Sequence, residues 1–206
     1  MVLLAIDTSA GTGVAVVDRD AGVLAERTSG DTRGHAEVMG RFIRECLDEA
    51  GIAVTALSGV AVGMGPGPFT GLRVGIAAAR AFAFGAGKPV VPIVSHDAVA
   101  FGLTVPTLVV TDARRREVYW SAYGGRDELG LPLREHGPSL VSPAELAGAV
   151  PDFGRYARLD AAEVSAASVG LLAESLFAHK RAFAEDVALY LRAPDATVPS
   201  APKRVS

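Results

Sequence analysis

Residues 63–75 read GMGPGPFTGLRVG, a loop rich in glycine and proline that leads into residues of helical character. Residues 57–62, which are mostly apolar, precede the loop and predict a buried strand. Residues 70–85 predict a long helix, which the hydroxyl of Thr70 can cap. A strand, a glycine-rich turn and a helix in this order indicate an α/β fold.

The glycine-rich loop could hold an anion or could serve packing. Backbone amides at the start of a helix are a common anion site. However, the loop lacks the Lys-Ser or Lys-Thr of a Walker P-loop and does not match the GxGxxG of dinucleotide folds. Gly71, Gly75 and Ala79 recur every four residues on one helical face, where small side chains let another helix come close. We therefore favour a packing surface over a phosphate cradle.

The preceding helix is predicted over residues 35–50, where apolar residues recur at helical spacing and Gly51 follows as a stop. Two neighbouring helices that present small and apolar residues outward usually face a partner. The alternative is that both stripes pack on the chain's own sheet. We expect Gly75→Arg to leave the chain folded and to abolish pairing. The predicted partner-interface residues are Val38, Phe42, Gly71, Gly75, Ala79 and Phe82.

The pattern at the start of the chain returns halfway along it. An apolar strand ends at Asp7 and a polar turn leads to a second strand, and the same order recurs around Asp112. Because the two aspartates lie about half the chain apart, the pattern indicates an internal duplication.

We expect two lobes and a tail. The first lobe spans residues 1–104 and the second residues 105–193, with helices over 143–149 and 168–183. Residues 151–160 fit no element, so we expect a reduced second lobe. Residues 194–206 are rich in Pro, Ala and Ser and predict a flexible tail.

Two hairpins that each carry an aspartate can hold nucleotide phosphates and a hydrated metal between two lobes. The first turn, DTSAGTG, has the small residues that let backbone amides approach a phosphate. The second turn, DARRREV, has arginines where glycine is needed. A capping aspartate in an ordinary hairpin is the alternative. The candidate nucleotide-binding residues are Asp7, Thr8, Ser9 and Asp112.

Other chemistry finds little support in the sequence. No two of His35, His96, His136 and His179 have the spacing that lets a helix chelate a metal, so we expect neither a metal site nor catalytic residues. Cys46 lies among apolar helix positions and predicts a buried filler.

Charge and hydropathy limit which partners and which cellular compartment the sequence predicts. The net charge of -3 does not favour direct binding of a nucleic acid, and three consecutive arginines from Arg114 predict a solvated turn. Met1 leads directly into VLLAI without a basic segment, and no apolar run is long enough for a membrane span. We expect a cytoplasmic protein.

The motifs GMGPGPFTGLRVGIA, DARRREVYWSAY, GHAE and ALYLRAPDAT together resemble the TsaB (YeaZ) family over most of the chain. The resemblance implies a two-lobed actin-like fold with a duplicated ribonuclease H-like core. It also implies kinship with TsaD, which carries a transferase site. In TsaD a strand like residues 89–94 precedes a His-x-x-x-His metal pair, and the matching positions here are His96 and Ala100. The missing second ligand implies a pseudoenzyme.

The resemblance further implies a non-catalytic subunit that is required for threonylcarbamoyl modification of a tRNA adenosine near the anticodon. Such a subunit binds and activates TsaD through helices 35–50 and 70–85, together with the small ATPase TsaE. It has no intrinsic cofactor, although ATP or ADP could bind where it meets its partners, and it meets tRNA only indirectly. A homodimer of the free chain through the same helices stays open.

Two enzyme hypotheses remain as alternatives. One is an independent actin-like kinase or ATPase that uses Asp7 and Asp112. The other is a metallopeptidase, which conflicts with the missing metal pair.

Overall fold

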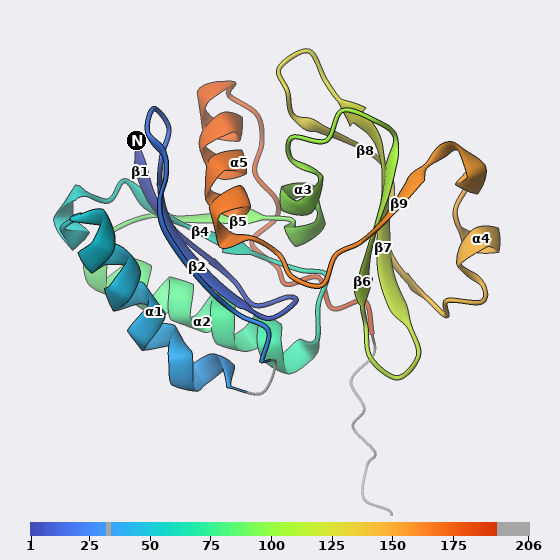
Figure 1. Cartoon of the computed structure of the whole chain (residues 1–206). Coiled ribbons are helices and arrows are strands. Elements are labelled where there is room, and N and C mark those ends of the chain that lie inside the picture. Colours follow the sequence, from blue (N-terminus) through green and yellow to red (C-terminus); the bar gives the residue numbers. More distant parts are fainter. Residues whose placement is uncertain (32–33, 193–206) are drawn as a thin grey trace, which may run out of the picture.

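The computed structural model describes residues 1–31 and 34–192, so the tail predicted over residues 194–206 lies outside the described part. Two β-sheets carry the fold (Figure 1). The first has the strand order β3-β2-β1-β4-β5 and the second the order β8-β7-β6-β9. The strands are β1 (Val2–Asp7), β2 (Thr12–Asp18), β3 (Gly22–Ser29), β4 (Gly59–Gly63), β5 (Val90–Ile93), β6 (Thr107–Asp112), β7 (Val118–Arg126), β8 (Pro132–Val141) and β9 (Ala157–Asp160).

The two sheets repeat one arrangement. In the first, β1 pairs antiparallel with β2 and parallel with β4, and in the second, β6 pairs antiparallel with β7 and parallel with β9. Asp7 and Asp112 occupy the same place in the two hairpins, because each is the last paired residue of its first strand. This register confirms the internal duplication.

Helices pack on both faces of the first sheet. On one side lie α1 (His35–Ala50) and α2 (Phe69–Ala86), and on the other α5 (Ala166–Ala178) and α3 (Ser95–Ala100), which stand between the two sheets (Figure 1). The single turn α4 (Leu146–Ala149) covers the outer face of the second sheet. None of the helices in the described part of the chain combines the length and the apolarity that a membrane crossing requires.

The local sequence explains how α1 and α2 end, and it misplaces the start of α2. Gly51 and Gly87 end the two helices in the left-handed conformation, with φ of 65° and 63°. The predicted cap at Thr70 is wrong, because α2 begins at Phe69 behind Pro68 and no side chain caps it. On the inner face of α1, Cys46 is buried and donates its thiol to the Val14 carbonyl at 3.3 Å, which confirms the predicted filler. Burial raises the pKa of this thiol to about 11.

The second lobe is small, as expected. The predicted boundary between the lobes, however, does not match the packing of the last helix. Residues 151–160, which fit no element in the sequence, contain a short 3-10 helix and the four-residue strand β9. The helix predicted over 168–183 is α5, which Ser165 caps by accepting a hydrogen bond from Ser168 N–H. This helix packs on the first sheet, where a Cβ on Gly170 would lie 2.6 Å from Val17. The second lobe predicted over residues 105–193 thus includes a helix, α5, that packs on the first sheet.

Candidate ligand pocket and helix face

Asp7 ends β1 with its carboxylate turned into the protein. It is 1% exposed, and its Oδ1 accepts hydrogen bonds from the amide and the hydroxyl of Ser9, at 2.7 and 2.5 Å. Its Oδ2 accepts a hydrogen bond from the Ser95 hydroxyl at 2.6 Å. A Cβ on Gly63 would lie 1.7 Å from that oxygen, so only glycine leaves room for it. Burial raises the pKa of Asp7, and the three hydrogen bonds oppose this shift. Asp7 therefore links β1 to the start of α3 by a hydrogen bond and packs closely against β4.

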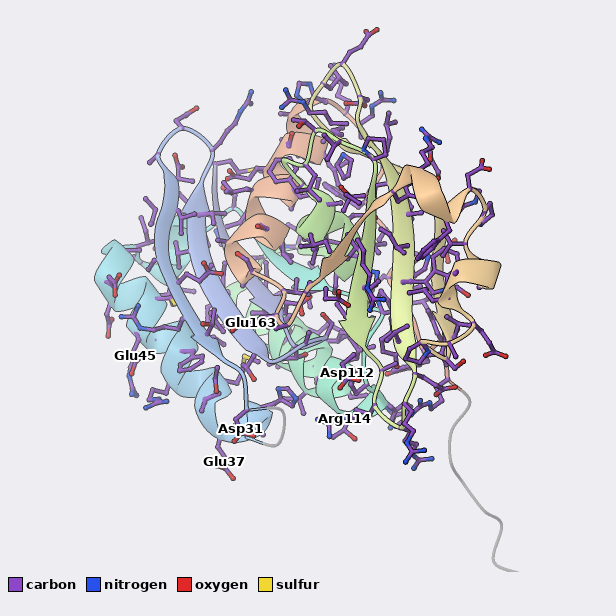
Figure 2. The ribbon with its side chains drawn as sticks, turned by 45° about the vertical axis from the view of Figure 1, so that its right-hand side comes forward. Asp31, Glu37, Glu45, Asp112, Arg114 and Glu163 are labelled. Carbon is purple, nitrogen blue, oxygen red and sulfur yellow. The ribbon has the colours of Figure 1, made fainter. Side chains whose placement is uncertain are left out.

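Asp112 occupies the matching place in the second hairpin but is exposed. Its Oδ1 accepts a hydrogen bond from the Arg114 amide at 2.9 Å, so this aspartate shapes the turn that carries the arginines. Figure 2 shows Asp112 and Arg114 at the tip of the hairpin, on the side of the molecule where Asp31 and Glu37 lie at the start of α1. The two aspartates thus differ in structural role, because Asp7 is buried while Asp112 is exposed at the end of its strand.

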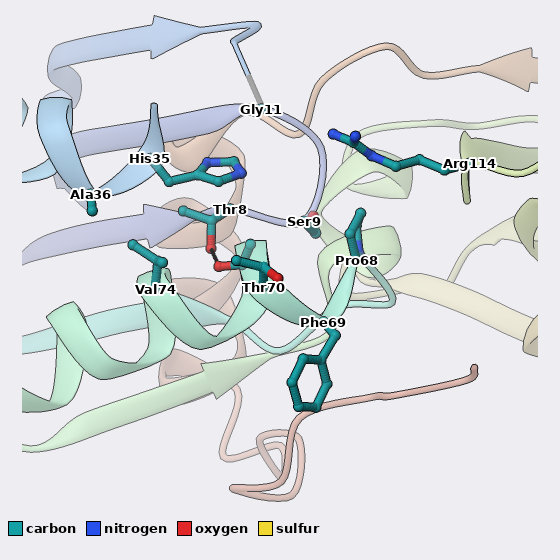
Figure 3. A pocket seen from close by; sticks show the side chains of 11 residues that line it. Thr8, Ser9, Gly11, His35, Ala36, Pro68, Phe69, Thr70, Val74 and Arg114 are labelled. Atoms are coloured by element: carbon teal, nitrogen blue, oxygen red, sulfur yellow. Dashed lines mark hydrogen bonds between the residues drawn. The ribbon is translucent and has the colours of Figure 1, made fainter. Parts of the chain in front are cut away.

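A pocket of about 500 Å³ opens between the start of α1, the start of α2 and the two hairpin turns (Figure 3). Thr8 and Ser9 lie in its wall, although the Thr8 hydroxyl donates to the Gly71 carbonyl at 2.7 Å and the Ser9 hydroxyl to Asp7. Among the described residues that line it, His35 and Arg114 are ionisable and none is acidic. Its lining residues are Thr8, Ser9, Gly11, His35, Ala36, Pro68, Phe69, Thr70, Gly71, Val74 and Arg114.

Sequence reasoning missed His35 as a pocket residue. Its side chain is buried at the first position of α1, and its Nδ1 lies 2.7 Å from the Thr12 hydroxyl. Burial lowers the pKa of the imidazole, the charge of Arg114 lowers it further, and the charge of Asp31 opposes both. The sequence places His35 before a helix, but only the fold brings it opposite Arg114.

His96 lies in the contact between the two lobes. Its Nδ1 is 2.8 Å from the Ser121 hydroxyl and its Nε2 is 2.9 Å from the Thr111 hydroxyl, so both ring nitrogens are engaged. Burial lowers the pKa of His96 to about 3. Ala100 follows one turn later on α3 and is also buried. Within residues 1–31 and 34–192, nowhere do three or more His, Cys, Asp or Glu side chains gather as a metal site would require.

The stripe of small residues on α2 faces inward. A Cβ on Gly71 would lie 2.6 Å from the Thr8 carbonyl, one on Gly75 would lie 2.1 Å from the Thr8 hydroxyl, and Ala79 is fully buried. Its predicted exposure is therefore wrong, because the stripe packs on the chain's own β1–β2 turn and sheet. On α1, Phe42 is also buried. Val38 on α1 and Phe82 on α2 are half-buried.

The outer face of the two helices carries a different set of small residues. Gly40 on α1 and Ala77, Ala81 and Gly85 on α2 are exposed, and Phe84 beside them is 91% exposed. A groove of about 560 Å³ runs between the two helices and the segment that follows α1. It is lined by Gly40, Ile43, Arg44, Leu47, Asp48, Ile52, Ala53, Val54 and Phe82.

Comparison with known proteins gives a consistent family. The model of the family described as TsaD, tRNA N6-adenosine threonylcarbamoyltransferase, matches residues 14–188. An uncharacterized protein of Mycobacterium tuberculosis is 40% identical over 198 residues, which cover 94% of this chain and 93% of that protein. The tRNA threonylcarbamoyladenosine biosynthesis protein TsaB of Escherichia coli is 31% identical over 148 residues, which cover 69% of this chain and 63% of that protein.

A solved structure agrees in fold. The crystal structure of a Pseudomonas aeruginosa protein with similarity to peptidase YeaZ superposes with a TM-score of 0.76 at 28% identity, and it covers 93% of this chain and 99% of that one. Together with the paired sheets and the repeated hairpins, this likeness confirms the predicted two-lobed actin-like α/β fold.

Proposed function

Because this chain belongs to the TsaB (YeaZ) family of TsaD-like proteins, we propose that it serves tRNA threonylcarbamoyladenosine biosynthesis as a non-catalytic subunit that binds and activates a TsaD homologue. The outer face of α1 and α2 carries this proposal. It offers small residues and a groove, and small residues let the helices of a partner approach closely. A TsaE homologue would join the pair, and ATP or ADP would bind where the partners meet.

The groove suits an apolar side chain from a partner helix. Ile43, Leu47 and Phe82 give it an apolar floor, and Arg44 and Asp48 add charges at which a partner can be selected. Exposed Phe84 extends the apolar surface along α2. A family that shares one fold between subunits also offers a helix pair of similar shape on the partner, which favours a four-helix contact.

The state of His96 supports the non-catalytic part of the proposal. Both of its ring nitrogens face hydroxyl groups inside the protein, and Ala100 offers no ligand atom. A metal bound to one ring nitrogen of His96 would displace one of these two hydrogen bonds and would gain one protein ligand. The same geometry speaks against a metallopeptidase.

The docking proposal can be tested with Ala81→Arg. Ala81 is exposed on α2, so the monomer should fold normally, while the long charged side chain holds a partner helix away. We expect the variant to lose co-elution with the host's TsaD homologue and to lose tRNA modification in a reconstituted reaction. Ala147→Arg, the same change at an exposed position of α4, is the control and should behave as wild type. Normal co-elution of Ala81→Arg, or full-rate modification without this chain, would refute the proposal.

The competing hypothesis is an independent ATPase that uses Asp7 and Asp112. The hydrogen bonds that occupy both carboxylate oxygens of Asp7 speak against it. ATP turnover by the isolated chain that disappears in Asp7→Ala, in a variant shown to be folded, would nevertheless establish it.

A further inference from the structure

We propose that the pocket between His35, the start of α2 and Arg114 binds the phosphate group of a small molecule of nucleotide size. The site includes Thr8 and Ser9 of the candidate nucleotide residues, whereas neither Asp7 nor Asp112 lines the pocket. Its lining residues are also different from those of the groove proposed for partner docking.

The start of α2 supplies the first group of donors. The first amide of this helix that bonds back into the turn before it belongs to Leu72, which donates to the Pro68 carbonyl at 3.0 Å. The amides of Phe69, Thr70 and Gly71 precede it, no side chain caps them, and the first turn contains no acidic residue. Residues 68–71 all line the pocket. A phosphate there would meet backbone N–H groups and the positive end of an 18-residue helix.

His35 is an independent observation that points to a ligand. Its side chain is 6% exposed, and Nδ1 is engaged with the Thr12 hydroxyl. No described residue places a hydrogen-bond partner at Nε2, and the ring lies in the pocket wall (Figure 3). When Thr12 donates to Nδ1, Nε2 carries the proton and can donate it to an acceptor in the pocket. The Nε2 edge of this buried imidazole is therefore available to an acceptor in the pocket.

Arg114 enters from the opposite wall, with its guanidinium extended toward the side on which His35 lies (Figure 3). It begins a turn in which Arg114, Arg115 and Arg116 all have positive φ, at 61°, 53° and 63°. The turn is fixed by the bond from the Arg114 amide to Asp112, and by Arg192, which donates to the Arg114 carbonyl and pairs with Glu117. Backbone in this region is costly for arginine, so these contacts hold the turn in its conformation.

The remaining walls fit the rest of such a ligand. Ala36, Pro68 and Val74 are apolar, and the volume of about 500 Å³ suits a ligand that carries a ring beside its phosphate. Asp31 and Glu37 lie at the start of α1, where their charges would repel an anion. This places the phosphate at the start of α2, between His35 and Arg114, where an arginine can pair with two of its oxygens.

The test uses pyrophosphate and ADP as probes, adenosine as an uncharged control, and a short single-stranded RNA as the competing source of phosphate, each titrated calorimetrically into the isolated chain. We expect pyrophosphate and ADP to bind, adenosine to bind more weakly, and Arg114→Ala to weaken ADP binding by about tenfold or more. Val74→Glu places a negative charge in the pocket and should abolish binding. Ala77→Glu, one turn along α2 and outside the pocket, should bind ADP as wild type does.

Three results would overturn the proposal: no binding of either probe to wild type, equal binding of ADP to wild type and to Val74→Glu, or binding of the RNA alone. If Arg114→Ala does not fold, the comparison of Val74→Glu with Ala77→Glu decides, provided that both unliganded variants melt as wild type does.

Discussion

Gly75 packs so closely on Thr8 that a Cβ at residue 75 would lie 2.1 Å from the Thr8 hydroxyl oxygen. That hydroxyl also donates to the Gly71 carbonyl, so it cannot rotate away without losing a hydrogen bond. This contact fixes α2 against the β1–β2 turn and turns its small-residue stripe inward. Gly75→Arg should therefore unfold the chain instead of breaking one interface, contrary to what the sequence led us to expect.

Gly75→Ala tests this contact. We expect it to lower the free energy of unfolding by about 1–3 kcal/mol, because the added methyl group overpacks the joint. Gly40→Ala is the control, since a Cβ added at Gly40 within α1 would have no neighbouring atom within 4 Å. It should raise stability by about 0.5–1 kcal/mol through helix propensity. Urea unfolding measures both variants, and a Gly75→Ala variant as stable as wild type would contradict the packing.

The buried carboxyl group of Glu174 on α5 predicts that the free energy of unfolding decreases as the pH rises from about 4.5 to about 7. It is 2% exposed, and within the described part of the chain neither carboxylate oxygen has a hydrogen-bond partner. Burial raises its pKa to about 7, against the opposing charge of the N-terminal amine. Because the folded pKa lies above the unfolded value, the contribution to stability is complete below about pH 4.5 and is lost as the pH rises to about 7.

Glu174→Gln removes this titration. We expect the variant to exceed wild type in unfolding free energy by about 2–3 kcal/mol at pH 8 and to match it near pH 4.5. Urea unfolding at the two pH values checks this. A difference between the variant and wild type that does not change with pH would show that Glu174 is not the group that titrates.

His96 predicts the opposite pH dependence, because its contribution to the free energy of unfolding decreases as the pH falls. Its folded pKa of about 3 lies below the usual value of 6.5, so the unfolded chain takes up the proton first. Stability from this residue is present above about pH 6.5 and is lost as the pH falls toward 3, by about 1.4 kcal/mol per pH unit. His96→Gln should be less stable at pH 7 by about 1–3 kcal/mol, since at least one of the two hydrogen bonds is lost.

The diagnostic quantity for His96 is the change in unfolding free energy between pH 7 and pH 5. Wild type should lose about 2 kcal/mol more than His96→Gln over this interval. Glu174 is present in both proteins, so its opposite contribution cancels in the comparison. Equal losses in the two proteins would mean that His96 is not held neutral by the contact between the lobes.

Arg116 predicts a gain in stability. It is exposed in the left-handed region with φ of 63°, where an L side chain is strained and glycine is not. Arg116→Gly should raise the free energy of unfolding by about 1 kcal/mol. Arg126→Gly, the same change at an exposed strand residue outside this region, should lower it by about 0.5–1 kcal/mol. Equal signs for the two changes in thermal or urea unfolding would contradict the assigned strain.

The local sequence pattern predicted the helices and strands well, but it did not predict which contacts their side chains make. Apolar spacing predicts α1, and Gly51 ends the helix as expected, but Phe42 faces the sheet and not a partner. The repeat of Asp7 at Asp112 correctly indicates two related hairpins. The same repeat could not show that one carboxylate is buried under Gly63 while the other is exposed in a turn.

The sequence by itself determined the duplicated hairpins, the two long helices and the buried cysteine, because these depend on contacts within a few residues or on a regular apolar period. Only the tertiary structure decided that Gly71 and Gly75 face Thr8, that α5 returns to the first sheet, and that His35 stands opposite Arg114. Periodicity identifies a face of a helix, but which face lies inside depends on segments far away in the chain. For α2, the distant segment is the turn that begins at Thr8.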